Sequence, residues 1–482
     1  MKKITTIILT LLLILPLTAC TNSKGESVAT YTINATLNKD MTLSVSTTYD
    51  FTKKSSKNKS LTCFALYPNA FREDAKIKPL HAEYYAQAYP NGNSDGGIEI
   101  EEVYLNGAKT AFSIDGVDQN LLSIKSDDYK AGNNSITIQS KVKIPNVLHR
   151  FGYGENTINL TSFYPIALVE ENGEFYENVY YPSGDPFYSE CANYFVTLTV
   201  PSQYAVASSL KPTKTEVFGL NTKYSYQRNS VRDIAFVLSK NFKILTKNTN
   251  KVCVYYYYFN DQNPQKSLDT AVKSLNYYSE NFSKYPYGEY VVCEADFIYG
   301  GMEYPCLTFI DEKLVGEDRD YCIAHETAHQ WWYSIVGVNQ IEEGYIDEGL
   351  TEYSTVRFLS DNSEYNTSKE ELLKKVKNAY GEMRKIVAKT GGKSKPEMQR
   401  NLKDFSSDLD YVSIAYYRSQ IMFFELENYM GKGKFNRFLK EILNKYSYKN
   451  INTAKMLEIA EKVKPGSKRF LQEYVSGISN AS

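Results

Sequence analysis

One stretch of the chain carries two histidines and a glutamate at a spacing that suits metal binding. His325 and His329 lie four residues apart, so on a helix both side chains project from the same face, one turn apart. Glu348 follows His329 after eighteen intervening residues. Two neutral imidazoles and one carboxylate give a tetrahedral zinc ion three protein ligands and leave one position open. We therefore expect one Zn²⁺ per chain, held by these three residues.

Two further glutamates are placed to support that chemistry. Glu326 follows the first histidine directly, where it can act as a general base that takes a proton from water. Glu352 comes one helical turn after Glu348 and can accept a hydrogen bond from the non-ligating nitrogen of a histidine ligand. The alternatives are a helix with two histidines that bind no metal, and a solvated side chain at Glu352.

The elements that must position these residues alternate between strands and helices. Apolar and aromatic runs predict strands over residues 252–258 and 290–299. Helical spacing is expected over residues 267–285, 320–336, 347–359, 368–387 and 414–430. Ser368 and Glu371 form a plausible capping box, and residues 393–400 read as a loop. These elements predict an α/β domain, mostly helical, over residues 246–482.

The preceding part of the chain has the period-two pattern of β-strands. Ile136, Ile138, Val142 and Ile144 alternate with polar residues, and Asn-Gly turn signals stand at residues 91–92, 106–107 and 172–173. A chain of 482 residues is also too long for one hydrophobic core. We therefore expect a multidomain protein in which an N-terminal all-β domain spans residues 31–245.

The first twenty residues have the features of an export signal. Lys2 and Lys3 precede an apolar run over residues 4–15, which is too short to cross a bilayer, and residues 17–20 read Leu-Thr-Ala-Cys. This ending resembles the lipobox of bacterial lipoproteins, which implies lipidation of Cys20, a signal peptide over residues 1–20 and a tether over residues 21–30. The protein would then be anchored at the extracellular face of the bacterial cell membrane. A plain secretory signal, cut nearby, is the alternative.

Charge and cysteine content bear on the class of partner and on disulfide formation. Lys and Arg number 55 and Asp and Glu 56, for a net charge of −1, and no basic run recurs, so a nucleic-acid partner is not expected. Six cysteines remain after Cys20, widely spaced and without a CxxC pair. Isolated thiols are the expectation, and a Cys293–Cys306 disulfide is the pairing to test.

Three motifs together resemble a known family. The His-Glu-x-x-His and Glu348 spacing is similar to that of the gluzincin aminopeptidases of family M1. Upstream, residues 300–305 read Gly-Gly-Met-Glu-Tyr-Pro and resemble that family's Gly-x-Met-Glu-Asn motif, and downstream Tyr411 and Tyr416 resemble its tyrosine pair. The resemblance implies a saddle-like N-terminal β domain followed by a thermolysin-like zinc peptidase domain. It covers residues from about 185 to 430.

The resemblance also implies roles for single residues. Glu303 would bind the free α-amino group of a peptide, with Gly300, Gly301 and Met302 along the substrate backbone. Tyr416 would donate a hydrogen bond to the oxyanion that forms when water attacks the peptide carbonyl. Together these roles imply a zinc aminopeptidase that acts on peptides.

Departures from the family pattern leave some choices open. Tyr304 replaces the usual Asn and could narrow the pocket for the first side chain. A second residue for the amine comes from the β domain in many relatives, and Glu177 and Glu190 are the candidates here. The alternative functions are a zinc endopeptidase, an inactive peptide-binding surface lipoprotein and, by fold analogy alone, an epoxide hydrolase.

Overall fold

The computed structural model describes residues 28–53, 60–209, 212–391 and 396–478. The expected signal peptide, most of the tether and the lipidation site at Cys20 lie outside these residues. Among the helices of the described ranges, none is long and apolar enough to cross a membrane.

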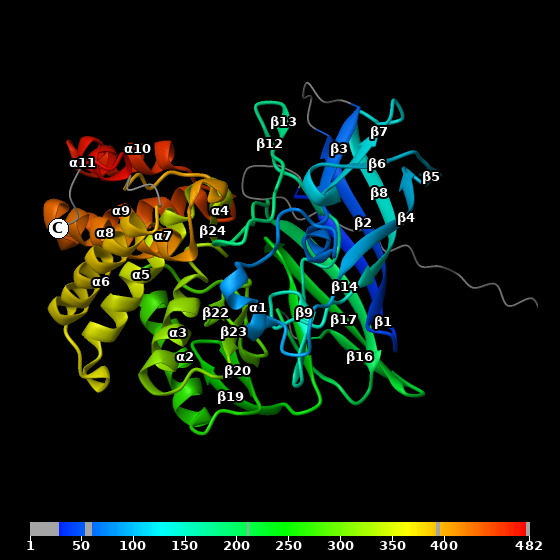
Figure 1. The fold of residues 1–482 in the computed structure, drawn as a ribbon, viewed down its shortest axis with the longest axis horizontal. Helices are drawn as coiled ribbons and strands as arrows, with labels where there is room; N and C mark the ends of the chain where they lie inside the picture. Colours follow the sequence, from blue (N-terminus) through cyan, green and yellow to red (C-terminus); the bar gives the residue numbers. More distant parts are fainter. Residues whose placement is uncertain (1–27, 54–59, 210–211, 392–395, 479–482) are drawn as a thin grey trace, which may run out of the picture.

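The first region of the chain is built almost entirely of strands (Figure 1). Within the described residues, the largest sheet has the order β16-β17-β14-β1-β2-β8-β4-β5, and two smaller sheets run β15-β18-β10-β9 and β11-β3-β7-β6. The strands are β1 (Thr30–Leu37), β2 (Thr42–Lys53), β3 (Leu61–Ala65), β4 (Gly97–Leu105), β5 (Ala108–Lys109), β6 (Ser113–Asp115), β7 (Leu121–Lys125), β8 (Gly132–Lys143), β9 (Gly152–Tyr153), β10 (Thr157–Thr161), β11 (Ile166–Ala167), β12 (Glu170–Glu171), β13 (Glu174–Phe175), β14 (Ala192–Pro201), β15 (Ala205–Ser208), β16 (Lys214–Phe218), β17 (Asn221–Val231) and β18 (Ala235–Ser239). Short helical turns interrupt them at η1 (Tyr67–Phe71), η2 (Ala82–Tyr84), α1 (Tyr85–Ala88) and η3 (Val117–Gln119).

The alternation in the sequence matches the burial of these strands. Along β8, Ile136, Ile138 and Val142 are fully buried while the residues between them are more exposed, with Ser140 as the exception. The Asn106-Gly107 turn joins β4 to β5, and both of its residues have positive φ, as a tight hairpin of this kind requires. The predicted all-β region is therefore present.

The second region begins with a five-stranded sheet of order β19-β20-β21-β23-β22. Its strands are β19 (Lys243–Thr249), β20 (Val252–Tyr258), β21 (Glu289–Ala295), β22 (Gly301–Met302) and β23 (Leu307–Asp311). The expected boundary between residues 245 and 246 falls inside β19, whose residues all pair with β20. Alternate residues of β21 face opposite ways: Val291 and Cys293 join the core of the first region, and Tyr290 and Val292 join the core of the helices. The sheet is thus packed between the two cores.

Helices make up most of the remaining chain. They are α2 (Pro264–Asn281), α3 (Gly316–Ala328), α4 (Gln340–Glu343), α5 (Tyr345–Asp361), η4 (Ser363–Tyr365), α6 (Lys369–Lys389), η5 (Leu402–Asp404), α7 (Asp408–Val412), η6 (Ser413–Arg418), α8 (Ser419–Met430), α9 (Lys432–Tyr446), α10 (Thr453–Val463) and α11 (Ser467–Val475), with the short strands β24 (Val336–Gly337) and β25 (Lys449–Asn450) beside them. The predicted capping box of α6 is present, because Ser368 and Glu371 each bond the other's backbone.

Two predicted helices differ from the structure. The helix expected over residues 320–336 ends at Ala328, because Trp331 and Trp332 turn into the core and donate their indole N–H groups to Ser283 and Ser354. The helix expected over residues 414–430 begins with η6, a widened turn of π-helix, and becomes α-helical only in α8.

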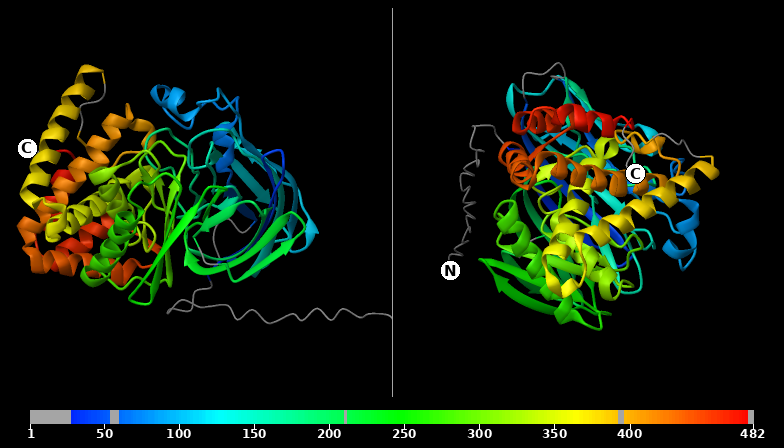
Figure 2. Two further views of the ribbon diagram at one scale, coloured as in Figure 1. Left: turned by 90° about the horizontal axis from the view of Figure 1, so that it is seen from below. Right: turned by 90° about the vertical axis from the view of Figure 1, so that its left-hand side faces the viewer.

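The two regions lie side by side (Figure 2) and are joined by buried polar contacts. Arg232, beyond the end of β17, donates to the carbonyl oxygens of Tyr333 and Lys449 and to the side chain of Asn450. A second link joins His81 of the first region to Asp408 at the start of α7, with Nε2 and Oδ1 3.3 Å apart. These contacts hold the helical region against the strands.

Candidate metal centre

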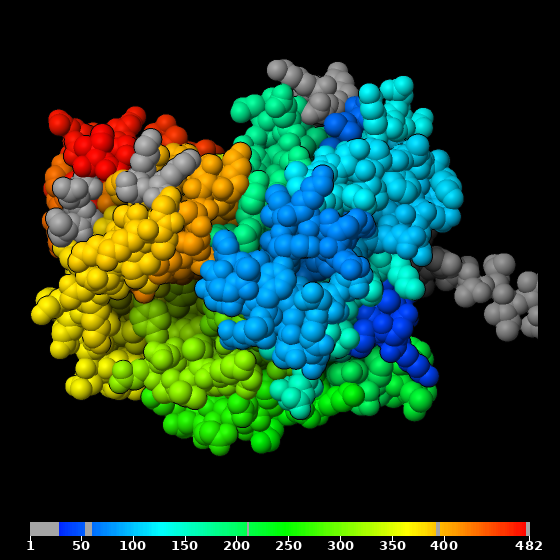
Figure 3. Space-filling model, in the orientation of Figure 1, coloured from blue at the N-terminus to red at the C-terminus, as the bar shows by residue number. Residues whose placement is uncertain are grey.

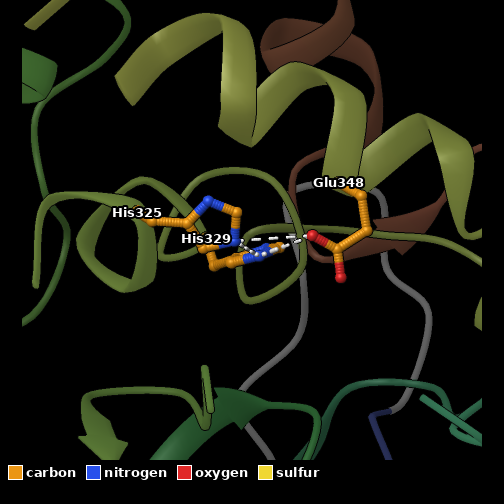
Figure 4. A group of neighbouring side chains, drawn as sticks. All are labelled: His325, His329 and Glu348. Carbon is orange, nitrogen blue, oxygen red and sulfur yellow. Dashed lines mark hydrogen bonds and ion pairs between the residues drawn. The ribbon is translucent and has the colours of Figure 1, made fainter. Parts of the chain in front are cut away.

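Three side chains converge where the sequence predicts a metal site (Figure 4). The Nε2 atoms of His325 and His329 are 3.1 Å apart, and Glu348 Oε2 lies 3.5 Å from the first and 3.4 Å from the second. Donor atoms around a tetrahedral ion at about 2.1 Å lie roughly 3.4 Å from one another. Glu348 Oε2 is also buried and has no hydrogen-bond partner. Two imidazoles and a carboxylate in this arrangement fit Zn²⁺.

The end of α3 orients the second imidazole. Since the helix stops at Ala328, the chain turns back and places the carbonyl oxygen of Trp332 2.9 Å from Nδ1 of His329. Thr351 Oγ1 of α5 lies 3.1 Å from the same nitrogen. A proton on Nδ1 can be donated to this carbonyl, which leaves Nε2 free to bind a metal.

Glu352 takes the position beside the first imidazole that its spacing predicts. Its Oε1 lies 3.1 Å from Nδ1 of His325, while its Oε2 accepts hydrogen bonds from Tyr321 and from Gln420 Nε2. Glu352 is buried, so the solvated alternative does not hold. The three contacts fix the carboxylate against the back of the imidazole.

The electrostatics of the three ligands favour a cation. Burial raises the pKa of Glu348, but the facing His329 and His325 outweigh it and lower the pKa to about 2. Burial lowers the pKa of His325, but hydrogen bonds to Glu348 and Glu352 outweigh it and raise the pKa to about 10. The carboxylate is therefore ionised, and a metal ion must displace protons from the imidazoles in order to bind.

Glu326 lies next to this cluster and faces a close stretch of backbone. A Cβ on Gly301 would come within 2.3 Å of Glu326 Oε1, so only glycine allows β22 this near. Burial raises the pKa of Glu326 to about 8, although His325 and His329 act in the opposite direction. Its Oε2 is buried without a hydrogen-bond partner. A carboxyl group with a raised pKa beside a metal site suits proton transfer near neutral pH.

Glu303 lies at the end of β22 among other buried carboxyl groups. Gln340 Nε2 donates to Glu303 Oε1 at 3.0 Å and to Asp347 Oδ2 at 2.9 Å. Burial, followed by the charge of Glu348, raises the pKa of Asp347 well above its usual range. Glu303, Glu326 and His329 each have one potential ligand atom within 4.8 Å of those of the other two. Such a concentration of buried carboxyl groups favours a cationic ligand group.

The tyrosine pair comes from α7 and the widened turn η6. Tyr416 donates a hydrogen bond from its hydroxyl group to Glu348 Oε1 at 2.7 Å. Burial, and then the charge of Glu348, raises the pKa of Tyr416 well above its usual range, so the phenol keeps its proton. Tyr411 has a buried hydroxyl group without a hydrogen-bond partner, and its ring centre is 6.0 Å from that of Tyr416.

One cavity of about 710 Å³ between the two regions is lined by His325, His329, Glu348, Glu352, Glu326, Glu303, Tyr411 and Tyr416. In Figure 3 a recess lies between the yellow helix α6 and the blue segment that contains α1. Arg150 and Asp185 of the first region also line it and form a buried ion pair. Burial raises the pKa of Asp185 to about 7, opposed by Arg150. Sequence reasoning did not single out this pair, and the only local signal was the Gly-Asp-Pro turn at residues 184–186.

Three expectations about the pocket are wrong. Tyr304 does not line the cavity and is fully buried against Phe309 in the core of the first region. Glu177 accepts from the backbone N–H of Val117 instead of facing the cavity, and Glu190 lines a separate cavity. The residue that the β region contributes to the carboxyl cluster is Asp185.

The cysteines of the described residues agree with the expectation of isolated thiols. Cys63, Cys191, Cys253, Cys293, Cys306 and Cys322 are all unpaired. The Cys293–Cys306 disulfide is therefore not formed.

The metal centre lies in a segment of the chain that resembles known proteins. Residues 266–476 match the model of the peptidase family M1 domain. The chain is 32% identical over 176 residues to leucine aminopeptidase 2 of Aspergillus fumigatus, which covers 35% of this chain and 28% of the relative. It is 29% identical over 188 residues to leukotriene A-4 hydrolase of Xenopus laevis. This match covers 38% of this chain and 30% of the relative. The matched segments thus span less than a third of these relatives.

Solved structures resemble the chain over nearly its whole length. An M1 zinc metallopeptidase from Deinococcus radiodurans superposes with a TM-score of 0.64 at 14% identity, covering 94% of each chain. Native yeast LTA4 hydrolase gives a TM-score of 0.68 at 16% identity, covering 93% of this chain and 68% of the other. The predicted fold class, a β region followed by a mostly helical peptidase domain, is confirmed. Over residues 266–476, the chain resembles the peptidase family M1 domain.

Proposed function

We propose that this protein is a zinc-dependent aminopeptidase that hydrolyses the N-terminal bond of peptides. The observation that carries the proposal is the convergence of a three-ligand metal site, Glu326 and Glu303 on one cavity. A zinc ion held by His325, His329 and Glu348 supplies Lewis-acid activation of water and of the substrate carbonyl. The names of the matched relatives, which include leucine aminopeptidases, support the same activity.

Glu326 performs the proton transfers in this proposal. Its raised pKa lets it accept a proton from the attacking water and later donate one to the leaving amine. Its position beside His325, with Oε2 free of hydrogen bonds, supports this role.

Tyr416 stabilises the negative charge that develops on the carbonyl oxygen. Its hydroxyl group is protonated and lies within the metal cluster, 2.7 Å from Glu348 Oε1. A hydrogen-bond donor placed in advance at an oxyanion typically contributes about 3–4 kcal/mol to the transition state.

Glu303 anchors the free amino group and so selects the first peptide bond. The buried carboxyl group of Glu303 repels those of Asp185 and Asp347, and a substrate ammonium group among them reduces that repulsion. Because the amine is fixed there, only the first peptide bond reaches the catalytic groups. Gly300, Gly301 and Met302, which lead into Glu303, line the path of the substrate backbone.

Two measurements test the proposal. Glu326→Gln should retain zinc but lose at least about a hundredfold in kcat, since general-base catalysis contributes roughly 10²–10⁴-fold. Glu317→Gln is the matched control, because Glu317 is exposed on the same helix α3 and does not line the cavity. Acetylation of a peptide's N-terminus should abolish cleavage. Equal cleavage of free and acetylated peptides would identify an endopeptidase, and full activity of Glu326→Gln would remove this residue from the mechanism.

We also propose, from the sequence of the N-terminus, that the enzyme is a lipoprotein. Removal of residues 1–19 and lipidation of Cys20 would hold the catalytic regions at the extracellular face of the bacterial membrane. Labelled palmitate should be incorporated into the wild-type protein and not into Cys20→Ala, and the variant should be released into the medium. Equal labelling of both proteins would contradict the assignment.

A further inference from the structure

One buried glutamine contacts two carboxyl groups of the cluster without lining the cavity. Gln340 is the first residue of the short helix α4 and is 1% exposed. Its Nε2 donates to Oε1 of Glu303 at 3.0 Å and to Oδ2 of Asp347 at 2.9 Å. Glu303 lines the cavity and Gln340 does not. The glutamine can therefore act on a ligand in the cavity only through Glu303.

The contacts of Gln340 connect Glu303 to the metal centre. Oδ1 of Asp347 accepts a hydrogen bond from the backbone N–H of Glu348, the third metal ligand, at 3.0 Å. The backbone N–H of Gln340 donates to the carbonyl oxygen of Phe187 in the first region at 3.2 Å. A short chain of hydrogen bonds thus runs from Glu303 to the backbone of Glu348, and Gln340 within it is fixed to the first region.

The amide of Gln340 is oriented by these two carboxyl groups. With its NH₂ group toward Glu303 and Asp347, both of them receive a donor, whereas the opposite orientation would place the amide oxygen against two other oxygens. The amide oxygen that is turned away, Oε1, is buried and has no hydrogen-bond partner among the described residues. A buried acceptor without a partner costs free energy, and proteins tolerate such costs mainly at functional sites. Stability alone does not account for a glutamine at this position.

We infer that Gln340 is a positioning residue for the substrate's amino group, because it fixes the Glu303 carboxylate relative to the metal centre. This inference rests on the proposed aminopeptidase activity. With Oε1 of Glu303 held by Gln340, the other oxygen of that carboxylate is left for the ammonium group in the cavity. An amine fixed at a set distance from the metal ligands brings the first peptide bond, and not the second, to the catalytic groups.

Loss of the bridging amide has two effects on Glu303. The carboxylate gains rotational freedom, which a bound amine must remove again, and it loses a charge-assisted hydrogen bond that separates it from Asp347. We expect binding of the amino group to weaken about tenfold, which corresponds to about 1.4 kcal/mol. Since the amine is bound alike in the ground state and the transition state, the loss should appear in KM and not in kcat.

Two zinc-binding inhibitors that differ in one group test this role with the zinc-loaded enzyme. Leucine hydroxamate carries the α-amino group, and 4-methylpentanohydroxamic acid is the same molecule without it, so the ratio of their inhibition constants measures the contribution of the amino group. Gln340→Met keeps the length of the side chain and removes its donors. It should lower this ratio about tenfold, while the inhibition constant of the amine-free compound and the zinc content stay within about twofold of the wild-type values. For Leu-Gly-NH₂, KM should rise about tenfold and kcat should stay within about threefold.

Gln399→Met is the matched control. Gln399 also donates to a buried glutamate of α4, Glu343, at 2.9 Å, but it does not line the cavity, so the ratio should stay unchanged. Gln340→Glu keeps the shape of the side chain, supplies at most one proton for the two carboxyl groups, and should lower the ratio if Gln340→Met does not fold. An unchanged ratio in a folded Gln340 variant, or equal weakening of both inhibitors, would overturn the inference. If the wild-type enzyme bound both inhibitors equally, the amine site and the proposed aminopeptidase activity would themselves fail.

Discussion

Glu352 offers a direct test of how the protein prepares its metal site. The carboxylate is buried, and Gln420, Tyr321 and His325 surround it. In Glu352→Gln the shape of the side chain is kept while its charge is removed. One of the two oxygens becomes an amide NH₂, which faces either the NH₂ group of Gln420 or Nδ1 of His325, so that two donors oppose each other in either orientation when Nδ1 carries its proton.

The size of the effect follows from the contact between Glu352 and His325. A hydrogen bond to a charged group contributes about 1.5–3 kcal/mol, and one between neutral groups about 0.5–1.5 kcal/mol. The difference of about 1–1.5 kcal/mol weakens zinc binding roughly tenfold. This agrees with the 10–100-fold losses typical when the outer partner of a histidine ligand is changed.

The assay is a zinc titration of metal-stripped protein in competition with a chelator of known affinity. It reads metal binding directly and does not depend on catalysis. Glu317→Gln, an exposed position on α3, should bind zinc like the wild type. If the dissociation constant of Glu352→Gln stayed within twofold of the wild-type value, the reasoning that Glu352 supports His325 would be refuted.

Three further changes have expected outcomes. Tyr416→Phe should lower kcat by roughly 10²–10³-fold with little change in KM, and steady-state rates within tenfold of the wild type would exclude it as the oxyanion donor. His81→Gln should lower the melting temperature by about 1–2 °C more at pH 6 than at pH 9. The hydrogen bond to Asp408 outweighs burial and raises the pKa of His81 above 6.5, so its stabilisation is fully present below pH 6.5 and is lost as the pH rises through the raised value. An equal loss at both pH values would contradict this link. Ser368→Ala removes the cap of α6 and should destabilise its first turn by about 1 kcal/mol, read as faster amide exchange there and not in α5.

The ligand set could be predicted from the sequence because its geometry is local. His325 and His329 are related by one helical turn, and Glu352 is related to Glu348 in the same way, so helical periodicity alone fixes which faces they share. The capping box of α6 could also be predicted, because Ser368 and Glu371 are only three residues apart. The strands of the first region could be predicted from the alternation of apolar and polar residues, since one face of each strand is buried.

The missed parts of the site depend on contacts between distant segments. Asp185 and Arg150 lie 35 residues apart, and both reach the cavity only because the first region packs against the five-stranded sheet. The end of α3 was misplaced because the burial of Trp331 and Trp332 overrides the helical pattern. Tyr304 was misassigned because its orientation depends on the core of the first region, which motif spacing does not describe.

The π-helical turn η6 has a consequence for how this enzyme can vary. A π-turn holds one more residue than an α-turn, so deleting a single residue between 413 and 415 would let the segment close into a regular helix. Each residue of an α-helix advances by about 100°, and the phenol of Tyr416 would swing away from Glu348 by that angle. The register of the chain in η6, as much as the identity of the tyrosine, determines whether the hydroxyl group reaches Glu348.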